Sequence, residues 1–564
     1  MKVVTYICHF MKQKGIDTIF ELQGGMITRI VDELHRDGSF RIVSMHHEQS
    51  VAFASDAYAR VLNKPCVALA TSGPGATNLI TGIGSCYFDS VPAIFITGQV
   101  NVNEQKGTKA TRQIGFQETD IVPIVTPITK AAFAIKSASE IPLVLEEAFR
   151  ISMEGRRGPV LIDIPMNLQH AEIDIYTLLP TLNVIQKDVS DVLRQFADKF
   201  KDALLKSERP LILIGRGVRS ANEVSRARQF VDKIRIPVVC SLLGLDAISY
   251  NHPCRVGFIG TYGNRWANYA LSECDLLLVL GSRLDLRQTG TDIASFQKNK
   301  MIFHIDIDEA ELNNRFEGCE VVKANVRDFL SRALELTYPV LKTNAWFDAI
   351  NKQYNDKPDT EELKDITGIN PNRFIHMLST ASGHAKAFIA DVGNNQMWAA
   401  QSLEINDDQM FLTSGGMGAM GYALPAAIGA SMALKNSAVI VISGDGGFQI
   451  NIQELQTIRR NNLPIKIIIL NNHSLGMIRQ FQDSYFDSCY QSTVWGYDAP
   501  NFVDIARAYK INAAEIHTPE EINSGLRKVW ANPLEPFLLD VLIDIHTNVN
   551  PKLKFGNPLS NMEP

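Results

Sequence analysis

The most regular pattern along the chain is a set of short apolar runs, each of which ends at Gly, Asn or Asp. Each run is apolar at consecutive positions, so the strand that it predicts would be buried on both faces. Between the runs, apolar positions recur with helical spacing. Strands that alternate with helices predict parallel sheets covered by helices. The runs are CVALATSG, PAIFITGQV, GPVLIDIP, PLILIGRG, DLLLVLGSR, MIFHIDID, AFIADVG, AVIVISGDG, PIKIIILNN and PFLLDVLID.

Two stretches interrupt this alternation and predict domain boundaries. Residues 175–190 lose the periodicity, and residues 337–370 are polar and rich in turn formers. A chain of 564 residues also exceeds the size at which one hydrophobic core stops growing. We therefore predict an α/β fold of three doubly wound parallel-sheet domains with a C-terminal tail. Their predicted limits are 1–172, 185–340, 365–550 and, for the tail, 551–564.

Composition narrows the classes of function. The 55 basic and 61 acidic residues are interspersed and give a formal charge of −6, so no basic stripe suits a nucleic acid. No apolar run is long enough to span a membrane, and charged residues interrupt the N-terminal segment. The eight cysteines lack any paired spacing, which favours reduced thiols over metal ligands. We expect a cytoplasmic protein with no nucleic-acid or membrane partner.

Two polar corners carry the strongest chemical signal. The segment GDGG, residues 444–447, joins a strand to a helical pattern, so its glycines would let backbone amides approach a phosphate. Asp445 would repel that phosphate unless a divalent cation bridged them, and Asn472 after the next strand could supply a second oxygen to Mg²⁺. Either corner alone is typical of a plain turn or cap. On consecutive strands, the two together predict a Mg²⁺-diphosphate site.

Glu48 is a candidate at the other end of the chain. It follows the short strand FRIVS and opens an apolar helix. An acidic residue at the start of a helix also stabilises that helix through its dipole, without any catalytic role. On the residues alone, this helix-dipole interpretation is the favoured one.

The GDG and NN corners resemble the cofactor motif of thiamine diphosphate enzymes, and nearly the whole chain is similar to the acetolactate (acetohydroxyacid) synthase group of that family. The resemblance implies a pyrimidine-binding first domain, a central FAD-binding-like domain and a third domain for thiamine diphosphate and Mg²⁺. It also implies a homodimer or homotetramer with active sites between subunits, and leaves a regulatory subunit undetermined. The segments that carry it are HEQSVAFASDAYAR, ATSGPGATNLITGIGSCYFDSVPAIFITGQV, GFQETDIVPIVTPITK, GRRGPVLIDIP, LTSGGMGAMGYALPAAIGA and NIQELQTIRRNNLPIKIIILNNHSLGMIRQFQD.

The resemblance also assigns roles to single residues. Asp445, Asn472 and the main-chain carbonyl of Ser474 would hold Mg²⁺, and Glu48 would hydrogen-bond the aminopyrimidine ring. Met420 would be the apolar wedge that bends the cofactor, although a methionine in such a stretch is otherwise core filler. The other catalytic matches are Gly25, Phe116, Gln117, Arg287, Met477 and Phe481. The other thiamine diphosphate contacts would be Thr71, Pro74, Asn78, Val392, Gly393, Asn394, Asn395, Gly418, Gly444, Gly446, Gly447 and again Met477.

The central segments LILIGRGVRS, VLGSRLDLRQTG and FHIDIDEAEL resemble the part of acetolactate synthases that holds FAD. A lone Gly-x-Gly after a strand is weak evidence for a dinucleotide. The polar pattern Arg283-x-Asp285-x-Arg287 strengthens the expectation of FAD, although whether the flavin would be redox-active stays open. By resemblance the flavin would contact Gly215, Gly217, Ser241, Leu242, Gly281, Arg283, Asp285, Asp306 and Asn325.

Departures from the family concern the second substrate. The chain has Phe481 for a usual tryptophan, Met166 for a lysine and Thr261-Tyr262 for a methionine-histidine pair, and the segment before GFQE is longer and more polar. Arg287 matches an arginine that meets the carboxylate of the second 2-oxo acid, although a surface or flavin-phosphate role is equally open. We expect decarboxylation of pyruvate, a 2-oxo acid donor, and carboligation of the resulting acetyl carbanion to a carbonyl acceptor. The alternatives are acetyl transfer to a nucleotide-linked ketosugar, a 2-oxo acid decarboxylase or oxidase, and a non-catalytic nucleotide-binding protein.

Overall fold

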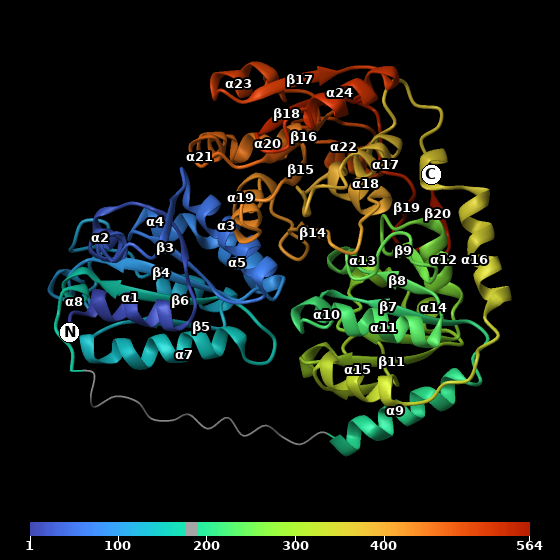
Figure 1. Cartoon of the computed structure of the whole chain (residues 1–564), viewed down its shortest axis with the longest axis horizontal. Coiled ribbons are helices and arrows are strands. Elements are labelled where there is room, and N and C mark those ends of the chain that lie inside the picture. Colours follow the sequence, from blue (N-terminus) through green and yellow to red (C-terminus); the bar gives the residue numbers. More distant parts are fainter. Residues whose placement is uncertain (175–189) are drawn as a thin grey trace.

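The computed structural model describes residues 1–174 and 190–564 and contains three six-stranded sheets (Figure 1). Every neighbouring pair of strands in these sheets is parallel, and helices connect the strands. This arrangement confirms the predicted α/β class with three doubly wound parallel sheets.

The first sheet has the strand order β2-β1-β3-β4-β6-β5. Its central strands are buried along their whole length, as the apolar runs predict. Its strands are β1 (Thr18–Leu22), β2 (Arg41–Ser44), β3 (Cys66–Ala70), β4 (Ala93–Gln99), β5 (Ala131–Ala134) and β6 (Val160–Pro165). Its helices are α1 (Val3–Gln13), α2 (Thr28–Asp37), α3 (Glu48–Leu62), α4 (Pro74–Asn78), α5 (Ile80–Phe88), α6 (Ile121–Val125), α7 (Ile141–Met153) and α8 (Met166–Gln169).

The central sheet has the order β12-β11-β10-β7-β8-β9. The chain therefore starts in the middle of the sheet and winds outward in both directions, which is the order of dinucleotide-binding folds. Its strands are β7 (Pro210–Ile214), β8 (Val238–Cys240), β9 (Arg255–Phe258), β10 (Leu276–Leu280), β11 (Met301–Asp306) and β12 (Glu320–Lys323). Its helices are α9 (Ser190–Leu204), α10 (Arg216–Ser220), α11 (Val224–Ile234), α12 (Arg265–Glu273), α13 (Leu286–Thr289), α14 (Ile293–Gln297), α15 (Val326–Glu335) and α16 (Asn344–Asp356).

The third sheet, β14-β13-β15-β16-β18-β17, repeats the strand order of the first. Its strands are β13 (Ala387–Ala390), β14 (Met410–Thr413), β15 (Val439–Gly444), β16 (Ile465–Asn471), β17 (Asn512–Ile516) and β18 (Phe537–Leu542). Its helices are α17 (Pro371–Ala381), α18 (Asn394–Ser402), α19 (Ala423–Ala433), α20 (Asp445–Ile450), α21 (Leu455–Arg460), α22 (Gly476–Tyr485), α23 (Phe502–Ala508) and α24 (Ile522–Val529).

The predicted domain limits stay predictions, and the first boundary, at residues 175–190, lies outside the described residues except for Ser190. The tail after residue 550 forms a short antiparallel pair, β19 (Lys552–Leu553) with β20 (Met562–Glu563). The amide of Leu553 donates to the carbonyl of Thr261, so the tail packs on the central domain.

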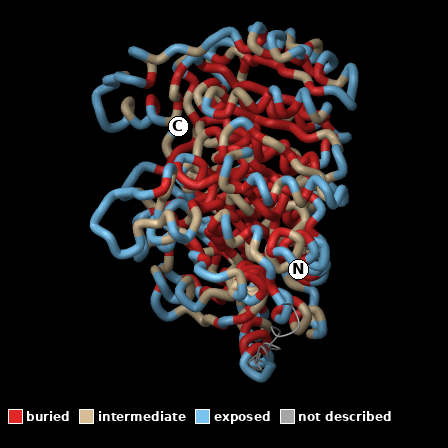
Figure 2. The backbone as a smooth tube through the Cα atoms, turned by 90° about the vertical axis from the view of Figure 1, so that its left-hand side faces the viewer, coloured by how far each residue is buried: buried red, intermediate tan, exposed pale blue. Residues whose placement is uncertain are grey.

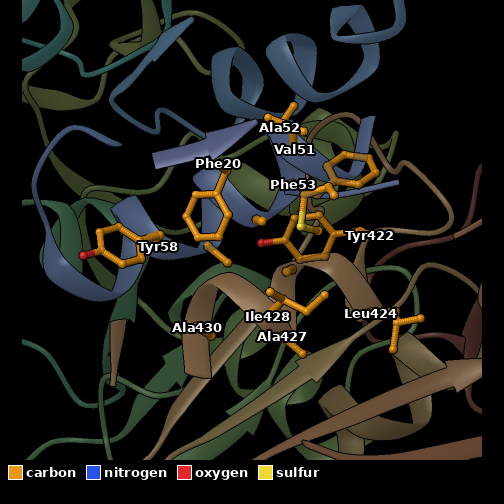
Figure 3. Packing of buried hydrophobic residues seen from close by; sticks show 14 of the residues in the cluster. Phe20, Val51, Ala52, Phe53, Tyr58, Tyr422, Leu424, Ala427, Ile428 and Ala430 are labelled. Atoms are coloured by element: carbon orange, nitrogen blue, oxygen red, sulfur yellow. The ribbon is translucent and has the colours of Figure 1, made fainter. Parts of the chain in front are cut away.

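One hydrophobic cluster crosses from the first domain to the third, where α3 packs on α19 (Figure 3). The Phe53 ring meets the Tyr422 ring edge to face with centroids 5.3 Å apart. The helices approach closely because Gly429 faces α3: a Cβ there would lie 1.9 Å from the carbonyl oxygen of Ala54. Figure 2 shows buried backbone running through all the layers, which is what packed parallel sheets require.

Two findings concern partners and cysteines. In residues 1–174 and 190–564, no helix combines the length and apolar character needed to cross a membrane. Six of the eight free thiols are buried, and the same residues hold no group of three or more His, Cys, Asp or Glu side chains with metal-binding geometry.

Candidate active site

The first part of the site lies where β15 and β16 end. These strands are neighbours, with Gly444 opposite Leu470, so Asp445 and Asn472 reach the same edge of the third sheet. Asp445 is buried and its Oδ2 accepts hydrogen bonds from the Ser474 amide (3.1 Å) and the Tyr497 hydroxyl (2.9 Å). Burial raises the pKa of Asp445 to about 6. The structure thus brings the three predicted metal ligands together, and adds Tyr497, which no motif indicated.

This corner fits a Mg²⁺-bound diphosphate. Two helices of nine or more residues, α18 and α22, begin beside it at Asn394 and Gly476, and helix N-termini favour anions. Among residues 1–174 and 190–564, buried Asn394 Oδ1 and Ser474 Oγ have no hydrogen-bond partner. Gly476 leaves the cradle open, because a Cβ there would lie 2.5 Å from Asn472 Nδ2 and 2.6 Å from Asn394 Nδ2. The unpartnered oxygens are atoms that a bound cation or its ligands would satisfy.

The loop between β14 and α19 closes over the same corner. Its end is fixed by buried Asp391, whose carboxylate accepts the amides of Gly421 (2.9 Å) and Ala423 (2.8 Å). A Cβ at Gly446 would lie 3.4 Å from the Met420 Cε, so the predicted wedge lies next to the GDG corner. The neighbouring predicted contacts Val392, Gly393, Asn394 and Asn395 follow β13, and Gly418 has φ +64°.

The second part of the site lies in the first domain, at the N-terminus of α3. Glu48 is buried, and its Oε2 accepts a hydrogen bond from Asn78 Nδ2 at 2.9 Å. Gly75 lies close by, since a Cβ there would be 3.3 Å from Glu48 Oε1. Thr71 Oγ1 accepts the amide of Met26 at 3.3 Å, which brings the segment of Gly25 alongside. The predicted residues Glu48, Gly25, Thr71, Pro74 and Asn78 therefore share one edge of the first sheet.

Phe116 and Gln117 lie in the loop before α6, and their settings differ. The Phe116 side chain is 81% exposed, so in the single chain it is not a core aromatic. Gln117 adopts a left-handed backbone conformation, φ +65°, against the buried residues Ser72 and Gly73.

Aromatic side chains lie around Phe481, another of the predicted catalytic residues. Met477 and Phe481 lie on α22, and the Phe481 ring stacks obliquely on Tyr485 with centroids 4.8 Å apart. The Phe555 ring of the tail also lies near Tyr485, with ring centroids 6.0 Å apart. Tyr485 and Phe555, like Tyr497, were not predicted, because scattered aromatics carry no motif.

The third part of the site is a cleft of about 450 Å³ in the central domain, with walls from all three domains. Eight of the nine predicted flavin residues line it. The ninth, Gly215, packs behind it, where a Cβ would lie 2.2 Å from the Gly281 carbonyl. The lining residues among the predictions are Gly217, Ser241, Leu242, Gly281, Arg283, Asp285, Asp306, Asn325 and also Arg287.

The cleft is rich in arginine. Arg156 pairs with Asp308 and Glu311, and these acids raise its pKa. Arg216 instead makes one hydrogen bond, to the Asp89 carbonyl at 3.0 Å, and burial lowers its pKa to about 10. The prediction missed both, although Arg216 stands between the two predicted glycines. Burial raises the pKa of the Asp306 carboxyl to about 6.

Within one chain, the first and third domains contact each other beside the Glu48 and Asp445 sites, not at them. Ser50 Oγ donates to Asn451 Oδ1, and Asn451 Nδ2 donates to Gln49 Oε1, both at 3.0 Å. In the part of the chain that the structure describes, no hydrogen bond or ion pair joins Glu48 to Asp445. The fold and these sites define a three-domain α/β protein that combines a corner suited to a Mg²⁺-bound diphosphate, a buried carboxyl and a cleft lined by glycines and arginines.

Comparison with known proteins agrees with this class. Models of thiamine pyrophosphate enzyme domains match in order: the N-terminal TPP binding domain at 1–124, the central domain at 197–333 and the C-terminal TPP binding domain at 391–541. The acetolactate synthase isozyme 2 large subunit of Escherichia coli K12 is 35% identical over 571 residues, covering 100% of this chain and 99% of that protein.

Other relatives give the same picture. The acetolactate synthase large subunit of Cyanidium caldarium is 38% identical, covering 97% of this chain and 94% of that protein. The acetolactate synthase large subunit of Lactococcus lactis is 35% identical, covering 97% of this chain and 93% of that protein. The chain therefore belongs to the thiamine pyrophosphate enzymes, in the family of acetolactate synthase large subunits, as its motifs predict.

Proposed function

We propose that the protein decarboxylates pyruvate and joins the acetyl group to a second carbonyl compound, with thiamine diphosphate as cofactor and acetolactate as the expected product. The observation that carries this proposal is the corner of Asp445, Asn472 and Ser474, with its two unpartnered buried oxygens and two helix N-termini. The kinship with acetolactate synthase large subunits supports the choice of donor and product.

In this proposal the third domain holds the cofactor through its diphosphate. The side chains of Asp445 and Asn472 and the Ser474 carbonyl would bind Mg²⁺, and the amides that open α18 and α22 would meet the phosphate oxygens. When bound, thiamine diphosphate supplies a carbon nucleophile that adds to the 2-oxo group and takes up the electrons released as CO₂ leaves. Met420 would support the cofactor from below.

Glu48 would hold the proton that passes between the protein and the pyrimidine ring. Its carboxyl is buried and oriented by Asn78, so it would meet the ring in one geometry and away from bulk water. The remaining predicted residues would line the space over the reacting carbon. Arg287, which is exposed at the cleft, would meet the carboxylate of a second 2-oxo acid.

FAD would occupy the central cleft. The size of the cleft, the strand order of the central sheet and the lining glycines suit a dinucleotide. Arg216 would meet a phosphate, because its guanidinium has one hydrogen bond to a carbonyl and no ion pair among the described residues.

The active unit would be a homodimer or a homotetramer, with Glu48 of one copy facing the diphosphate corner of another. Large exposed apolar side chains beside the Glu48 site and the Asp445 corner support this, because a second copy would cover them. Phe116 is 81%, Ile478 52% and Trp495 53% exposed. Since the relatives are named large subunits, a separate regulatory subunit is expected as well.

A second candidate acceptor is a nucleotide-linked ketosugar, and the loop at residues 106–114 favours it. This loop carries Lys106, Lys109 and Arg112 and no acidic residue, and none of the three forms an ion pair with a described residue. The carboxylate of Glu118 accepts the amides of Lys106 and Ile114, which fixes the loop beside Phe116. Unpaired cations there would attract phosphates.

The proposed function is tested with purified protein, thiamine diphosphate, Mg²⁺, FAD and pyruvate. Wild type should release CO₂, and Glu48→Gln should lower kcat about 100-fold or more because a neutral amide cannot exchange that proton. Thr5→Ala is the control, because the Thr5 hydroxyl lies in the first domain and, among the described residues, its hydrogen bond is to Glu33. If wild type releases no CO₂ from pyruvate with any carbonyl acceptor, the donor assignment is wrong.

The same mixture with a panel of acceptors identifies the product by mass spectrometry. Acetolactate from pyruvate alone supports the first candidate. If a nucleotide-linked ketosugar is the acceptor, changing Lys106, Lys109 and Arg112 together to Gln should raise its KM about tenfold and leave pyruvate turnover unchanged. Lys298→Gln, an exposed lysine of the central domain, is the charge control.

A further inference from the structure

The loop that carries Phe116 and Gln117 is held by buried polar side chains that neither the diphosphate corner nor the cleft uses. Gln117 has φ +65°, a left-handed conformation that is unfavourable for a residue with a Cβ. Such a conformation persists where the surroundings determine it, and it often accompanies function. Here the groups that hold this conformation are Ser72, Gly73 and Gln99.

Ser72 and Gly73 hold Gln117 from one side. Ser72 is buried, and its Oγ donates to the Gln117 carbonyl at 2.7 Å. The same Oγ lies 3.1 Å from Gln99 Oε1, but a hydroxyl has one proton, so we assign the donation to the shorter contact. Gly73 allows the approach, since a Cβ there would lie 3.0 Å from the Gln117 Cβ and 3.2 Å from its carbonyl oxygen.

Gln99 holds the loop two residues further on. Its Nε2 donates to the Thr119 carbonyl at 2.7 Å and to Asp163 Oδ2 at 2.9 Å, and its Oε1 accepts the Val100 amide at 3.0 Å. Asp163 Oδ1 accepts the Thr97 hydroxyl at 2.7 Å. Because two acceptors face its nitrogen and a donor faces its oxygen, the Gln99 amide has a single satisfied orientation.

The fold explains why these groups converge. Ser72 follows β3, Gln99 ends β4 and Asp163 lies on β6, and the three strands are consecutive in the first sheet. Residues 117–119 therefore cross the carboxyl edge of the sheet and are fixed there at two carbonyls. The exposed Phe116 therefore directly precedes a backbone segment that is fixed to the sheet at Gln117 and Thr119.

We propose that Ser72 and Gln99 are positioning residues: they hold residues 117–119 in the conformation that directs Phe116 and Gln117 at the reacting carbon. This inference rests on the proposed function for the role of the pair, but the holding of the loop can be measured without it. In this proposal Ser72 and Gln99 act through their hydrogen bonds to the backbone carbonyls of Gln117 and Thr119.

The test compares Ser72→Ala and Gln99→Met with wild type as full-length protein loaded with thiamine diphosphate, Mg²⁺ and FAD. Hydrogen exchange of the amides of residues 117–121 should become about fivefold faster in Ser72→Ala, and faster still in Gln99→Met. With pyruvate, kcat should fall about tenfold while half-saturation by thiamine diphosphate changes by less than about twofold. Released acetaldehyde should rise relative to the carboligation product.

Ser152→Ala is the matched control, because Ser152 is equally buried in the first domain and its hydroxyl also donates to a carbonyl, that of Phe149 at 2.8 Å. It should leave the exchange of residues 117–121 and kcat unchanged. Unchanged exchange in both test variants would overturn the proposal, and so would a loosened loop with wild-type kcat and product ratio. If wild type does not convert pyruvate, the proposed function fails, whereas the exchange result still decides whether Ser72 and Gln99 hold the loop.

Discussion

At the scale of single residues, Asp163 shows how burial sets a pH dependence. The carboxyl is enclosed in the first sheet, and burial raises its pKa from 3.8 to about 7, although the hydrogen bonds from Thr97 and Gln99 oppose this. The folded state therefore binds a proton that the unfolded state has released between these values, so this group makes the free energy of unfolding fall as pH rises through that range.

We predict that Asp163→Asn weakens this pH dependence. Asparagine resembles the protonated acid: its oxygen can accept from Gln99 and its NH₂ can donate to the Thr97 hydroxyl. The free energy of unfolding, measured by urea denaturation at several pH values, should fall less between pH about 4 and about 7 in the variant than in wild type. An identical slope in both proteins would show that Asp163 does not titrate in this range.

Single residues also show what could be predicted of the site. Asp445, Asn472 and Glu48 were recognisable because each follows a strand at a fixed motif spacing, and the structure groups them with the expected neighbours. Tyr497 and Arg216 were not, because their importance comes from chain segments that only the tertiary fold brings to the corner and the cleft. The roles of all these residues stay predictions.

At the scale of elements, the sequence predicts buried strands better than edge strands. All ten apolar runs are strands in the interior of a sheet. Edge strands such as β5 and β17 are partly exposed along their length, so they lack a continuous apolar run. The interior strands β1 and β8 were missed, because β1 contains the polar residues Thr18 and Glu21 and β8 is only three residues long. Burial on both faces is thus the property that the apolar runs report.

The contact between α3 and α19 gives a prediction at this scale. A Cβ at Gly429 would lie 1.9 Å from the Ala54 carbonyl oxygen, and backbone cannot give way as a side chain can. Gly429→Ala should therefore lower the free energy of unfolding by about 3 kcal/mol, as overpacking in a core does. Denaturation curves would measure this. Gly383→Ala is the control, because nothing lies within 4 Å of its Cβ position, and it should be neutral or slightly stabilising.

At the scale of the whole molecule, a buried ionic network joins the domains. Arg60 of α3 pairs with Asp56 and Asp89, and Asp89 also accepts the amides of Gly415 and Gly416 in the loop that carries Met420. The carbonyl of Asp89 accepts the bond from Arg216 of the central cleft, so Asp89 lies where all three domains meet.

Removing the positive charge of Arg60 should therefore affect more than one domain. Arg60→Met leaves two buried carboxylates without their partner and should cost about 3–5 kcal/mol of unfolding free energy. Arg332→Met, which breaks an exposed pair with Glu335, should change it by less than about 1 kcal/mol. Urea denaturation followed by tryptophan fluorescence would compare the two. Equal stabilities would mean that the Arg60 network does not hold the domains together.

The proposed dimer makes the strongest prediction for the assembly. If each site takes Glu48 from one copy and Asp445 from the other, Glu48→Gln and Asp445→Asn should each be inactive alone. A mixed dimer of the two variants would hold one site with both changes and one site with neither. Random pairing of equal amounts makes half of the dimers mixed, so co-expression of two differently tagged chains should restore about a quarter of wild-type activity. Purification through both tags should raise this to about half. If each chain built its own site, neither preparation would recover any activity, because every site would carry one of the two changes.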